Sequence, residues 1–434
     1  MNGNKFILII VLWTSCAYAQ VEHIVDQRAI FKLNDAIAKM DTVDVLTKAD
    51  TVPFFVVPQE ATNDTIYFDS SDQVLNIGLC LPLLVDSVYS EESFENSLLI
   101  TNKLINGAFD FYCGAHMAFD SLQKKYPFIH LYIFDSSIDT FNIDSLLKDN
   151  KLSEMDIIVG PLLDKYFEKM MTYCDTNNIY IVSPSKNAIN NGSEFYRKST
   201  APLISYYDTI SNFLLTKYDS LRQKVIISQN FDDAKIIEFN SNFNSIPNAK
   251  KLVGAKPYIL EILDSSTIEV IDDSIIYILG RLDHRIIFIN SVNESFVYKV
   301  FSELDKVKDS IHFTVIGLPN WENFKSIDIS FYNNFNVIFG STYYVNYKDP
   351  EVARFRENFI YNYRTEPSKF AFLGYDNMFF TIEDLISPVE GYTWKGLSSS
   401  YHLSYIVNGE EQIFKENSYF HILQFLYGQI VKIQ

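Results

Sequence analysis

From Val74 onward, short apolar runs alternate with segments whose apolar residues recur at helical spacing. The runs LNIGLCL, HLYIFD, DIIVGP and IYIVSP are short and rich in Ile, Leu and Val, so the pattern predicts buried strands. Between the first two runs, Ala115, Ala118, Phe119 and Leu122 predict a helix near residues 106–125 that turns one face to a sheet. Strands that alternate with helices predict a parallel sheet covered on both faces.

The same alternation starts again after Thr200. A predicted helix leads to the run KVIISQ, and later RIIFIN passes through Ser291 into a helix whose apolar face includes Phe296 and Phe301. Asn293 is a good N-cap for that helix, because its short polar side chain can accept a backbone N–H. HFTVIGLPNW closes this second block, and we expect Trp321 in it to be a packing residue.

Residues 336–380 predict a strand, a helix started by Pro350 and a second helix that opens at Gly374-Tyr375-Asp376. Asp376 and Asn377 would cap this second helix, or alternatively serve in a hinge. From Gly391 onward, the runs YHLSYIV, EQIFK and HILQFLYGQIVKIQ are strand-like, with turns predicted at 408–409 and 416–417.

This order of elements predicts an α/β protein of two lobes, each a mostly parallel doubly wound sheet with flanking helices, joined by three crossovers of the chain. We expect lobe 1 to comprise residues 74–197 and 320–390, and lobe 2 to comprise 198–319 and 391–434. In residues 20–73, Ile24, Ile30, Leu33 and Ile37 suggest one short amphipathic helix, and polar, Thr- and Asp-rich sequence with apolar islands at 54–57 and 66–68 follows it. We predict that this segment forms an N-terminal arm or linker.

Residues 1–19 have the form of a cleavable export signal. Lys5 precedes an apolar run over 6–13, and Ala17 and Ala19 supply the small residues that signal peptidase requires. A lipoprotein signal with Cys16 as the lipidated residue is the alternative. No other segment is apolar over the roughly 18 residues of a membrane helix, so we expect a mature protein without a membrane span.

The formal net charge of −18 disfavours nucleic acid and anionic lipid as partners. Cleavage after Ala19 would leave Cys80, Cys113 and Cys174, which we expect to be buried free thiols, with a Cys80–Cys113 bridge as the alternative. Neither a CxxC pair nor a zinc-ligand spacing occurs in the sequence, so no metal site and no cofactor is expected.

Ligands of doubly wound sheets bind beyond the carboxyl ends of the strands, where loops lead into helices. Serine and asparagine there can bind a carboxylate or an amide together with helix N–H groups. The alternative for Ser183-Pro184-Ser185 is a turn and cap without a ligand. This geometry selects as candidate ligand-binding residues Leu162, Leu163, Ser183, Ser185, Lys186, Asn230, Phe231, Ser291 and Asn293.

Motifs of common catalytic sites are absent from the sequence, including GxSxG, HExxH, the P-loop and GxGxxG. Pairs of carboxylates are expected by chance among 54 acidic residues, so they carry no catalytic signal. We therefore expect a protein that is not an enzyme.

The segments FYCGAHMAFDSL, MDIIVGPLL, IYIVSPSKN, VIGLPNWENF, PEVARFRENFIYNYRTEPSKFAFLGYD and NGEEQIFKENSYFHILQF resemble an exported protein family of Bacteroidota. The resemblance covers residues 74–434 and implies a type I periplasmic-binding fold, similar to that of Leu/Ile/Val-binding proteins. Many members of that family carry an N-terminal LysM module that binds peptidoglycan. Residues 20–73 lack the LysM pattern, so the tethering function of that module is not expected here.

The resemblance implies a non-enzymatic extracytoplasmic protein that binds a small solute between its lobes: an amino acid, a peptide or a cell-wall fragment such as a muropeptide. The alternative is a platform for protein partners in the cell envelope, as in the related activators of peptidoglycan synthases, with a degenerate solute site. Leu162 and Leu163 favour this alternative, because they stand where amino-acid binders offer polar groups.

Overall fold

The computed structural model describes residues 74–83, 103–136, 140–185, 193–217, 224–228, 258–261, 284–306, 308–309, 312–389, 391–408 and 411–433. The chain divides into two compact units. Unit 1 comprises Met1–Thr200 and Val345–Asn417, and unit 2 comprises Ala201–Tyr344 and Ser418–Gln434, so the chain passes between them three times. This connectivity confirms the predicted two-lobed α/β architecture.

Unit 1 is built on an eight-stranded sheet with the strand order β11-β12-β13-β5-β4-β3-β1-β2. Strands β2, β1, β3, β4, β5 and β13 pair in parallel, while β11 and β12 add an antiparallel edge. In chain order its elements are β1 (Leu75–Leu81), α5 (Lys103–Lys125), β2 (Ile129–Asp135), α6 (Thr140–Leu146), η1 (Leu152–Glu154), β3 (Ile157–Val159), α7 (Asp164–Asn177), β4 (Tyr180–Ser183), β5 (Tyr196–Lys198), α13 (Pro350–Tyr363), α14 (Lys369–Ile386), β11 (Thr393–Lys395), β12 (Ser400–Asn408) and β13 (Glu411–Asn417).

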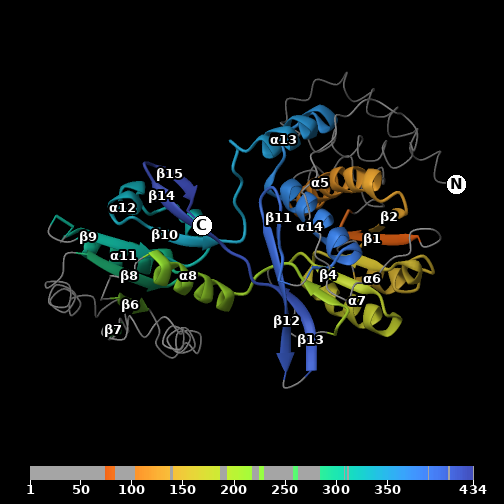
Figure 1. Ribbon diagram of the computed structural model, residues 1–434, viewed down its shortest axis with the longest axis horizontal. Helices are drawn as coiled ribbons and strands as arrows, with labels where there is room; N and C mark the ends of the chain where they lie inside the picture. Colours follow the sequence, from red (N-terminus) through yellow and green to blue (C-terminus); the bar gives the residue numbers. More distant parts are fainter. Residues whose placement is uncertain are drawn as a thin grey trace. The chain divides into compact units, whose positions relative to one another are not determined.

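Helices cover both faces of this sheet, as the continuous apolar strands require. In Figure 1, α5 and α14 lie on one side of the sheet, and α6 and α7 lie on the other. The α7 side is filled by a core cluster that includes Cys80, Phe167, Cys174 and Phe414. Cys80, Cys113 and Cys174 are buried free thiols, which confirms that expectation over the alternative bridge.

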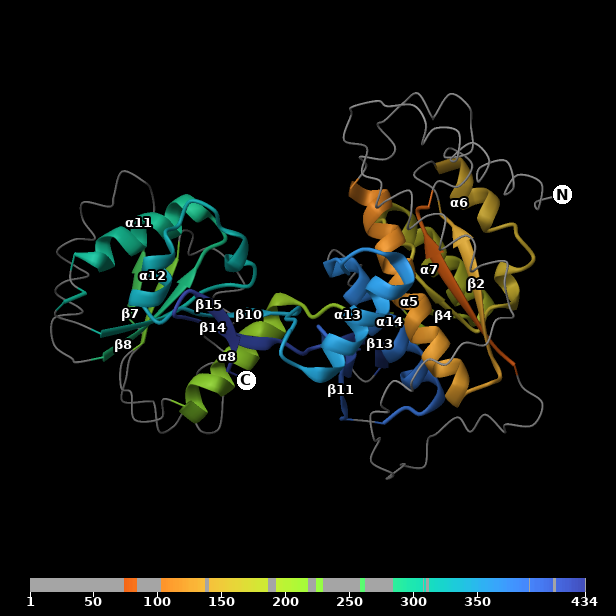
Figure 2. The same cartoon turned by 90° about the horizontal axis from the view of Figure 1, so that it is seen from above.

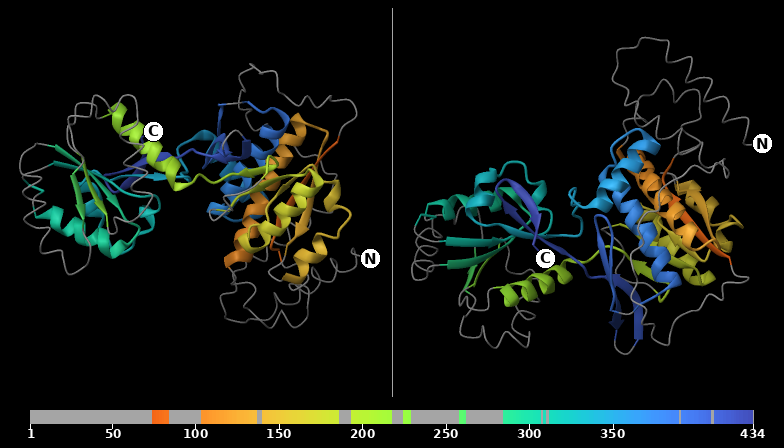
Figure 3. Two further views of the ribbon diagram at one scale, coloured as in Figure 1. Left: turned by 90° about the horizontal axis from the view of Figure 1, so that it is seen from below. Right: turned by 45° about the horizontal axis from the view of Figure 1, so that its top comes forward.

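Helices α5 and α14 run side by side and approach closely through two glycines (Figure 3). A Cβ atom at Gly114 would lie 1.8 Å from the carbonyl oxygen of Ala371, and one at Gly374 would lie 2.0 Å from that of Phe111. Any side chain larger than hydrogen would therefore push the two backbones apart.

Helix α14 begins earlier than the sequence indicated. Ser368 is its N-cap and accepts the N–H of Phe370, so Gly374, Tyr375 and Asp376 lie in the middle of the helix. The prediction that Asp376 and Asn377 cap a helix start is wrong. Within α14, Gly374 faces the backbone of α5, and the Asp376 carboxylate faces the loop before β12. Neither residue lies at a helix end.

Unit 2 contains a seven-stranded sheet with the order β15-β14-β10-β9-β8-β6-β7. Its elements are α8 (Leu203–Lys217), β6 (Lys224–Ser228), β7 (Tyr258–Glu261), β8 (His284–Asn290), α11 (Glu294–Asp305), β9 (His312–Ile316), η3 (Trp321–Asn323), α12 (Ile329–Asn334), β10 (Ile338–Ser341), β14 (His421–Leu426) and β15 (Gln429–Lys432). Strands β7, β6, β8, β9 and β10 pair in parallel, and β14 and β15 pair antiparallel. Figure 2 shows α11 and α12 on one face of this sheet and α8 on the other.

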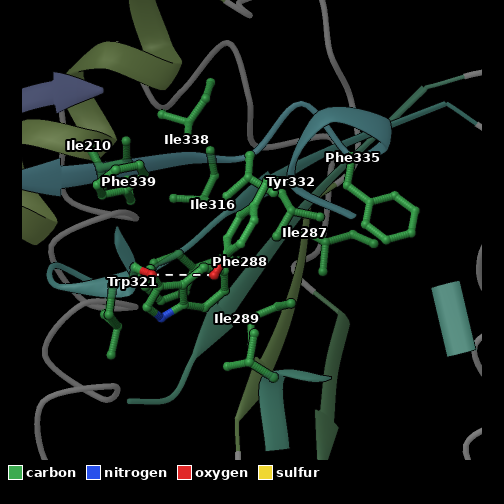
Figure 4. Close-up of a cluster of buried hydrophobic side chains, with 14 of the residues drawn as sticks. Ile210, Ile287, Phe288, Ile289, Ile316, Trp321, Tyr332, Phe335, Ile338 and Phe339 are labelled. Atoms are coloured by element: carbon green, nitrogen blue, oxygen red, sulfur yellow. Dashed lines mark hydrogen bonds between the residues drawn. The ribbon is translucent and has the colours of Figure 1, made fainter. Parts of the chain in front are cut away.

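The core of unit 2 is rich in aromatic side chains, and Trp321 lies within it (Figure 4). Its side chain is fully buried against Gly317 and Phe301, its indole N–H donates to the carbonyl oxygen of Ser291 at 3.0 Å, and its own carbonyl accepts the Tyr332 hydroxyl. Trp321 is thus a packing residue, as predicted.

The first boundary between the units, after Thr200, lies three residues beyond the predicted one, and the other two boundaries lie further from their predicted places. Residues 320–344 belong to unit 2 because β10 pairs with β9 and β14 there, and residues 391–417 belong to unit 1 because β12 and β13 extend its sheet. The turn predicted at 416–417 lies at the end of β13, and the run predicted as one strand over HILQFLYGQIVKIQ is split into β14 and β15.

The export signal with Cys16 and the predicted arm over 20–73 lie outside the described residues. Among the helices that the structure describes, none combines the length and the apolar character needed to cross a bilayer.

Candidate functional site

Both sheets repeat one winding order, which places a topological switch point in each. In unit 1 the chain starts at β1, adds β2 on one side and then β3, β4 and β5 on the other. In unit 2 it starts at β6, adds β7 on one side and then β8, β9 and β10 on the other. In such sheets the ligand crevice opens at the carboxyl ends of the two strands where the direction reverses, here β1 and β3, and β6 and β8.

Leu162 and Leu163 follow β3 and therefore lie at the switch point of unit 1. Gly160 precedes them with a φ of 97°, and a Cβ there would lie 2.3 Å from the carbonyl oxygen of Cys80 on β1. Glycine at this position lets the loop after β3 pass close to β1. Leu162 and Leu163 are half-buried, and Leu163 packs on the core cluster of the α7 face.

The N-terminus of α7 starts from this loop without a side-chain cap. Leu163 occupies the N-cap position with extended backbone, and its side chain makes no capping hydrogen bond. Its carbonyl oxygen accepts the N–H groups of Tyr166 and Phe167, which begins the helix. An uncapped helix N-terminus keeps N–H donors and a partial positive charge available for an anion.

Ser183 is the last residue of β4, one strand further along, and Ser185 follows it by two residues. Ser183 is fully buried, and its hydroxyl oxygen accepts the N–H of Ser185 at 3.3 Å. The carbonyl oxygen of Ser183 accepts both the N–H and the hydroxyl of Ser199, and that of Ser185 accepts the Thr200 hydroxyl at 2.7 Å. The structure brings these residues together as a hydrogen-bonded turn between β4 and the end of β5.

In unit 2, Ser291 and Asn293 follow β8 at the second switch point. The Ser291 hydroxyl oxygen accepts the N–H of Asn293 at 3.0 Å, and Asn293 Oδ1 accepts the N–H of Phe296 at 3.2 Å. The predicted N-cap at Asn293 is confirmed. Lys186, Asn230 and Phe231 lie outside the described residues.

Asp376 is the polar residue whose role the sequence did not reveal. Its carboxylate is buried within unit 1 and accepts four hydrogen bonds from one loop: the N–H of Leu397 at 2.7 Å, the N–H and hydroxyl of Ser398 at 2.9 and 2.6 Å, and the N–H of Ser399 at 2.9 Å. Burial raises the pKa of Asp376 to about 6, although the four hydrogen bonds act to lower it. The carboxyl group is therefore mainly ionised at pH 7.

Two signals in the sequence accompany this arrangement. Asp376 ends an apolar stretch of α14 that begins at Phe370, and a Gly-Leu-Ser-Ser-Ser run leads into the first residue of β12. A Cβ at Gly396 would lie 2.4 Å from Asp376 Oδ1, so the first residue of that run has to be small. The arrangement anchors the loop between β11 and β12 to α14, and we assign it a structural role.

The described residues contain no group of three or more His, Cys, Asp or Glu side chains that could hold a metal ion. The chemistry available at the switch point of unit 1 is instead that of backbone N–H donors beside apolar side chains.

The fold with these two switch points is that of the type I periplasmic-binding proteins. A branched-chain amino acid ABC transporter protein from Rhodospirillum rubrum is similar in structure over 83% of this chain and 100% of its own, with 12% identity and a TM-score of 0.54. Full-length LpoA from Haemophilus influenzae is similar over 83% of this chain, with 14% identity and a TM-score of 0.51, and the match spans 59% of the LpoA chain.

An LpoA C-domain structure from the same organism, described as a regulator of PBP1A, matches 83% of this chain with 14% identity and a TM-score of 0.49. No protein-family model matches the chain, and no curated protein matches it in sequence. At identities this low, the likeness establishes the fold.

Proposed function

We propose that this protein is a non-enzymatic extracytoplasmic binding protein that binds a small solute with an anionic group and an apolar part. The observation that carries the proposal is the uncapped N-terminus of α7 at the switch point of unit 1. The N–H groups of the first turn and the helix dipole would bind a carboxylate, as helix N-termini do in many anion sites.

The side chains beside that helix end fit the apolar part of such a solute. Leu162 and Leu163 are half-buried, and cleft sites for small molecules are mostly apolar with few polar groups. An amino acid, a short peptide and a cell-wall peptide fragment all combine a carboxylate with aliphatic groups. The Rhodospirillum rubrum neighbour, named for branched-chain amino acid transport, agrees with this class of solute.

Leu163→Asp tests the proposal directly, because an aspartate at the N-cap would itself accept the helix N–H groups that the solute needs. The cap would stabilise the helix by about 1 kcal/mol, which offsets part of the lost apolar contact of Leu163. Leu147→Asp is the matched control, since Leu147 is also a half-buried leucine on the same core cluster.

The measurement is thermal unfolding of residues 20–434 against amino acids, short peptides and muropeptides. A solute at 100 times its dissociation constant stabilises the fold by about 2.7 kcal/mol. We expect one class to raise the melting temperature of the parent protein and of Leu147→Asp, and to leave Leu163→Asp unchanged. A panel without any shift, or an equal shift in Leu163→Asp, would contradict the proposal.

A second candidate function is a platform for a protein partner in the cell envelope. Ser183 favours this second function, because its side chain is fully buried and its hydroxyl oxygen accepts the N–H of Ser185 within the turn. The hydroxyl at this strand end is therefore used inside the protein rather than offered to a solute. LpoA, which has this fold, is named as a regulator of PBP1A. The thermal-unfolding panel separates the candidates: a shift that Leu163→Asp removes favours the solute function, and a panel without any shift favours the platform.

The location outside the cytoplasm, the membership in the Bacteroidota family and the link to peptidoglycan are parts of this proposal. The periplasmic-binding-like fold and the LpoA neighbour support an extracytoplasmic location. Export is tested by fractionation of producing cells and by N-terminal sequencing, which should begin at Gln20.

A further inference from the structure

The edge of the unit 1 sheet at β2 is long for an edge strand. β2 is the last strand in the sheet order and, among the described strands, pairs with β1 alone (Figure 2). It has seven residues, whereas the edge strand β11 at the other end of this sheet has three and the edge strand β15 of unit 2 has four. Natural proteins keep open edges short, because an open edge pairs readily with another chain.

Backbone groups of two residues point outward from this edge. The N–H of Ser136, just beyond β2, donates to the carbonyl oxygen of Leu81 on β1 at 2.8 Å. Backbone groups of successive residues in a strand point to opposite sides, so the N–H and C=O groups of Leu131 and Ile133 point away from β1. Within the described part of the chain, nothing is hydrogen-bonded to these four groups. β2 thus offers two donors and two acceptors to a further strand.

The usual protections of an open edge are missing from β2. Its sequence IHLYIFD contains neither lysine nor proline, and its register with β1 is continuous, without a bulge. Leu131, Tyr132 and Ile133 are half-buried, so their side chains would gain burial from a neighbouring strand. An edge of this length and composition requires a cover.

Residues 64–69, in the arm that precedes β1, have the sequence of a strand. They lie outside the described residues and read Asp-Thr-Ile-Tyr-Phe-Asp, in which Thr, Ile, Tyr and Phe all favour strands. The segment contains no proline, so each of its residues has a backbone N–H to donate. In a strand, Ile66 and Phe68 would share one face and extend the apolar surface of the sheet.

The short connection to β1 fixes the direction of such a strand. Residues 70–74 separate the segment from β1, and five extended residues span about 16 Å. A strand beside β2 would lie two strand spacings from β1, which is about 10 Å. The connection is therefore long enough, but it is too short for a parallel crossover, which needs about a dozen residues or more. An antiparallel arrangement fits.

We propose that residues 64–69 pair antiparallel with the free edge of β2 and add a strand of the chain's own arm to the eight-stranded sheet of unit 1. Since this strand runs opposite to β2, residue 64 lies at the carboxyl end of the sheet, the end of the switch point. The pairing therefore leads residues 20–63 out at that end of unit 1. The inference uses the backbone of β2 and does not rest on the solute proposal.

Ile66→Pro/Tyr67→Pro tests the pairing in the mature chain, residues 20–434. The two consecutive prolines remove one N–H from each side of the segment, so an N–H that faces β2 is lost in either register. Phe55→Pro/Val56→Pro is the matched control, because it changes two consecutive apolar residues in another apolar run of the same arm.

Hydrogen exchange with residue resolution, measured by mass spectrometry, follows the N–H groups of Leu131 and Ile133. We expect both to exchange slowly in the parent protein and at least about 10-fold faster in Ile66→Pro/Tyr67→Pro, with no change in the control variant. The N–H groups of β3, which lies inside the sheet, should exchange equally in all three proteins and serve as the internal reference.

Disulfide formation identifies the occupant of the edge. Tyr132→Cys is combined with a cysteine at each position from 65 to 68 in turn, because the Cα atoms of directly opposite residues lie about 4.5–5.5 Å apart, within disulfide range. We expect a disulfide within one chain in at least one of these combinations. Tyr132→Cys combined with Val56→Cys should form none.

Four outcomes would overturn the inference. The first is fast exchange of Leu131 and Ile133 in the parent protein, and the second is equally slow exchange in Ile66→Pro/Tyr67→Pro. The third is an equal acceleration in the control variant. The fourth is a disulfide that forms only between two copies of the chain. Each can occur whether or not unit 1 binds a solute, so failure here is distinguishable from failure of the solute proposal.

Discussion

Replacing Asp376 by alanine should destabilise unit 1, because three buried N–H groups would lose their acceptor. The donors belong to Leu397, Ser398 and Ser399, all of which are buried. An unsatisfied buried donor costs about 1–3 kcal/mol, so the three together cost roughly 3–9 kcal/mol.

Removing the carboxylate also has a favourable consequence, which has to be subtracted. Burial raises the pKa of Asp376 from 3.8 to about 6, so the ionised group is less favourable in the folded state by about 3 kcal/mol, at 1.36 kcal/mol for each pKa unit. Taking the middle of the range for the donors, we expect Asp376→Ala to lower the free energy of unfolding by about 3 kcal/mol at pH 7.

The pH dependence follows from the direction of the pKa shift. Between about pH 4 and pH 6 the folded state binds the Asp376 proton more tightly than the unfolded state, so the contribution of this group to stability falls as the pH rises through this window. The stability lost in Asp376→Ala should therefore be larger at pH 4 than at pH 7, by up to about 3 kcal/mol.

Urea unfolding followed by tryptophan fluorescence measures this effect. Trp394 packs with Phe380 and Tyr401 in unit 1, and a Trp321→Phe background removes the signal of unit 2. Asp175→Ala, at an exposed aspartate on α7, is the control and should change stability by less than about 0.5 kcal/mol. A loss for Asp376→Ala below about 1 kcal/mol at pH 4, or a loss that grows between pH 4 and pH 7, would refute the reasoning.

Gly114→Ala should destabilise unit 1 strongly, because the new Cβ would lie 1.8 Å from the Ala371 carbonyl oxygen. In the same helix, the new Cβ of Gly107→Ala would meet only the Phe370 ring, at 3.2 Å. Gly107→Ala should therefore cost little stability, or gain up to about 1 kcal/mol from the higher helix propensity of alanine. Thermal unfolding of the two variants should show opposite or clearly unequal shifts. Tyr206→Phe should cost about 1 kcal/mol in urea unfolding, since the buried hydroxyl donates to the Gly317 carbonyl oxygen; an unchanged midpoint would contradict this bond. The thiols of Cys80, Cys113 and Cys174 should react with a thiol reagent at pH 8 only after unfolding, because all three are buried. Burial also raises the pKa of the Cys80 thiol to about 12, so the reactive thiolate is scarce at pH 8. Fast labelling of the native protein would be inconsistent with this arrangement.

The elements of this protein were predictable because each depends mainly on its own residues. The strands HLYIFD and IYIVSP end where the sequence indicated, at Asp135 and Ser183, and the helix predicted over 106–125 is α5. Asn293 caps α11 as expected, since an N-cap acts on backbone groups two or three residues away. Local periodicity and capping are readable from the sequence for this reason.

Strand partners were not predictable in the same way. β13 pairs with β5, joining Lys415 to Arg197, and this pairing moves residues 391–417 into unit 1. An apolar run indicates that a strand exists, but any parallel strand of similar composition can accept its hydrogen bonds. The partner is decided by how the helices and crossovers fill both faces of the sheet.

The candidate site shows the same division. From the sequence alone, Ser183 was placed at the end of a strand, and Ser185, Ser291 and Asn293 were placed after strands; this placement follows from the order of elements. The tertiary structure decided what their polar groups do: the Ser183 hydroxyl is used within its turn, and four hydrogen bonds come to Asp376 from a loop about 20 residues further along the chain. Sequence determined the secondary structure and the fold class, because these depend on local periodicity, whereas hydrogen-bond partners and burial depend on contacts between distant segments.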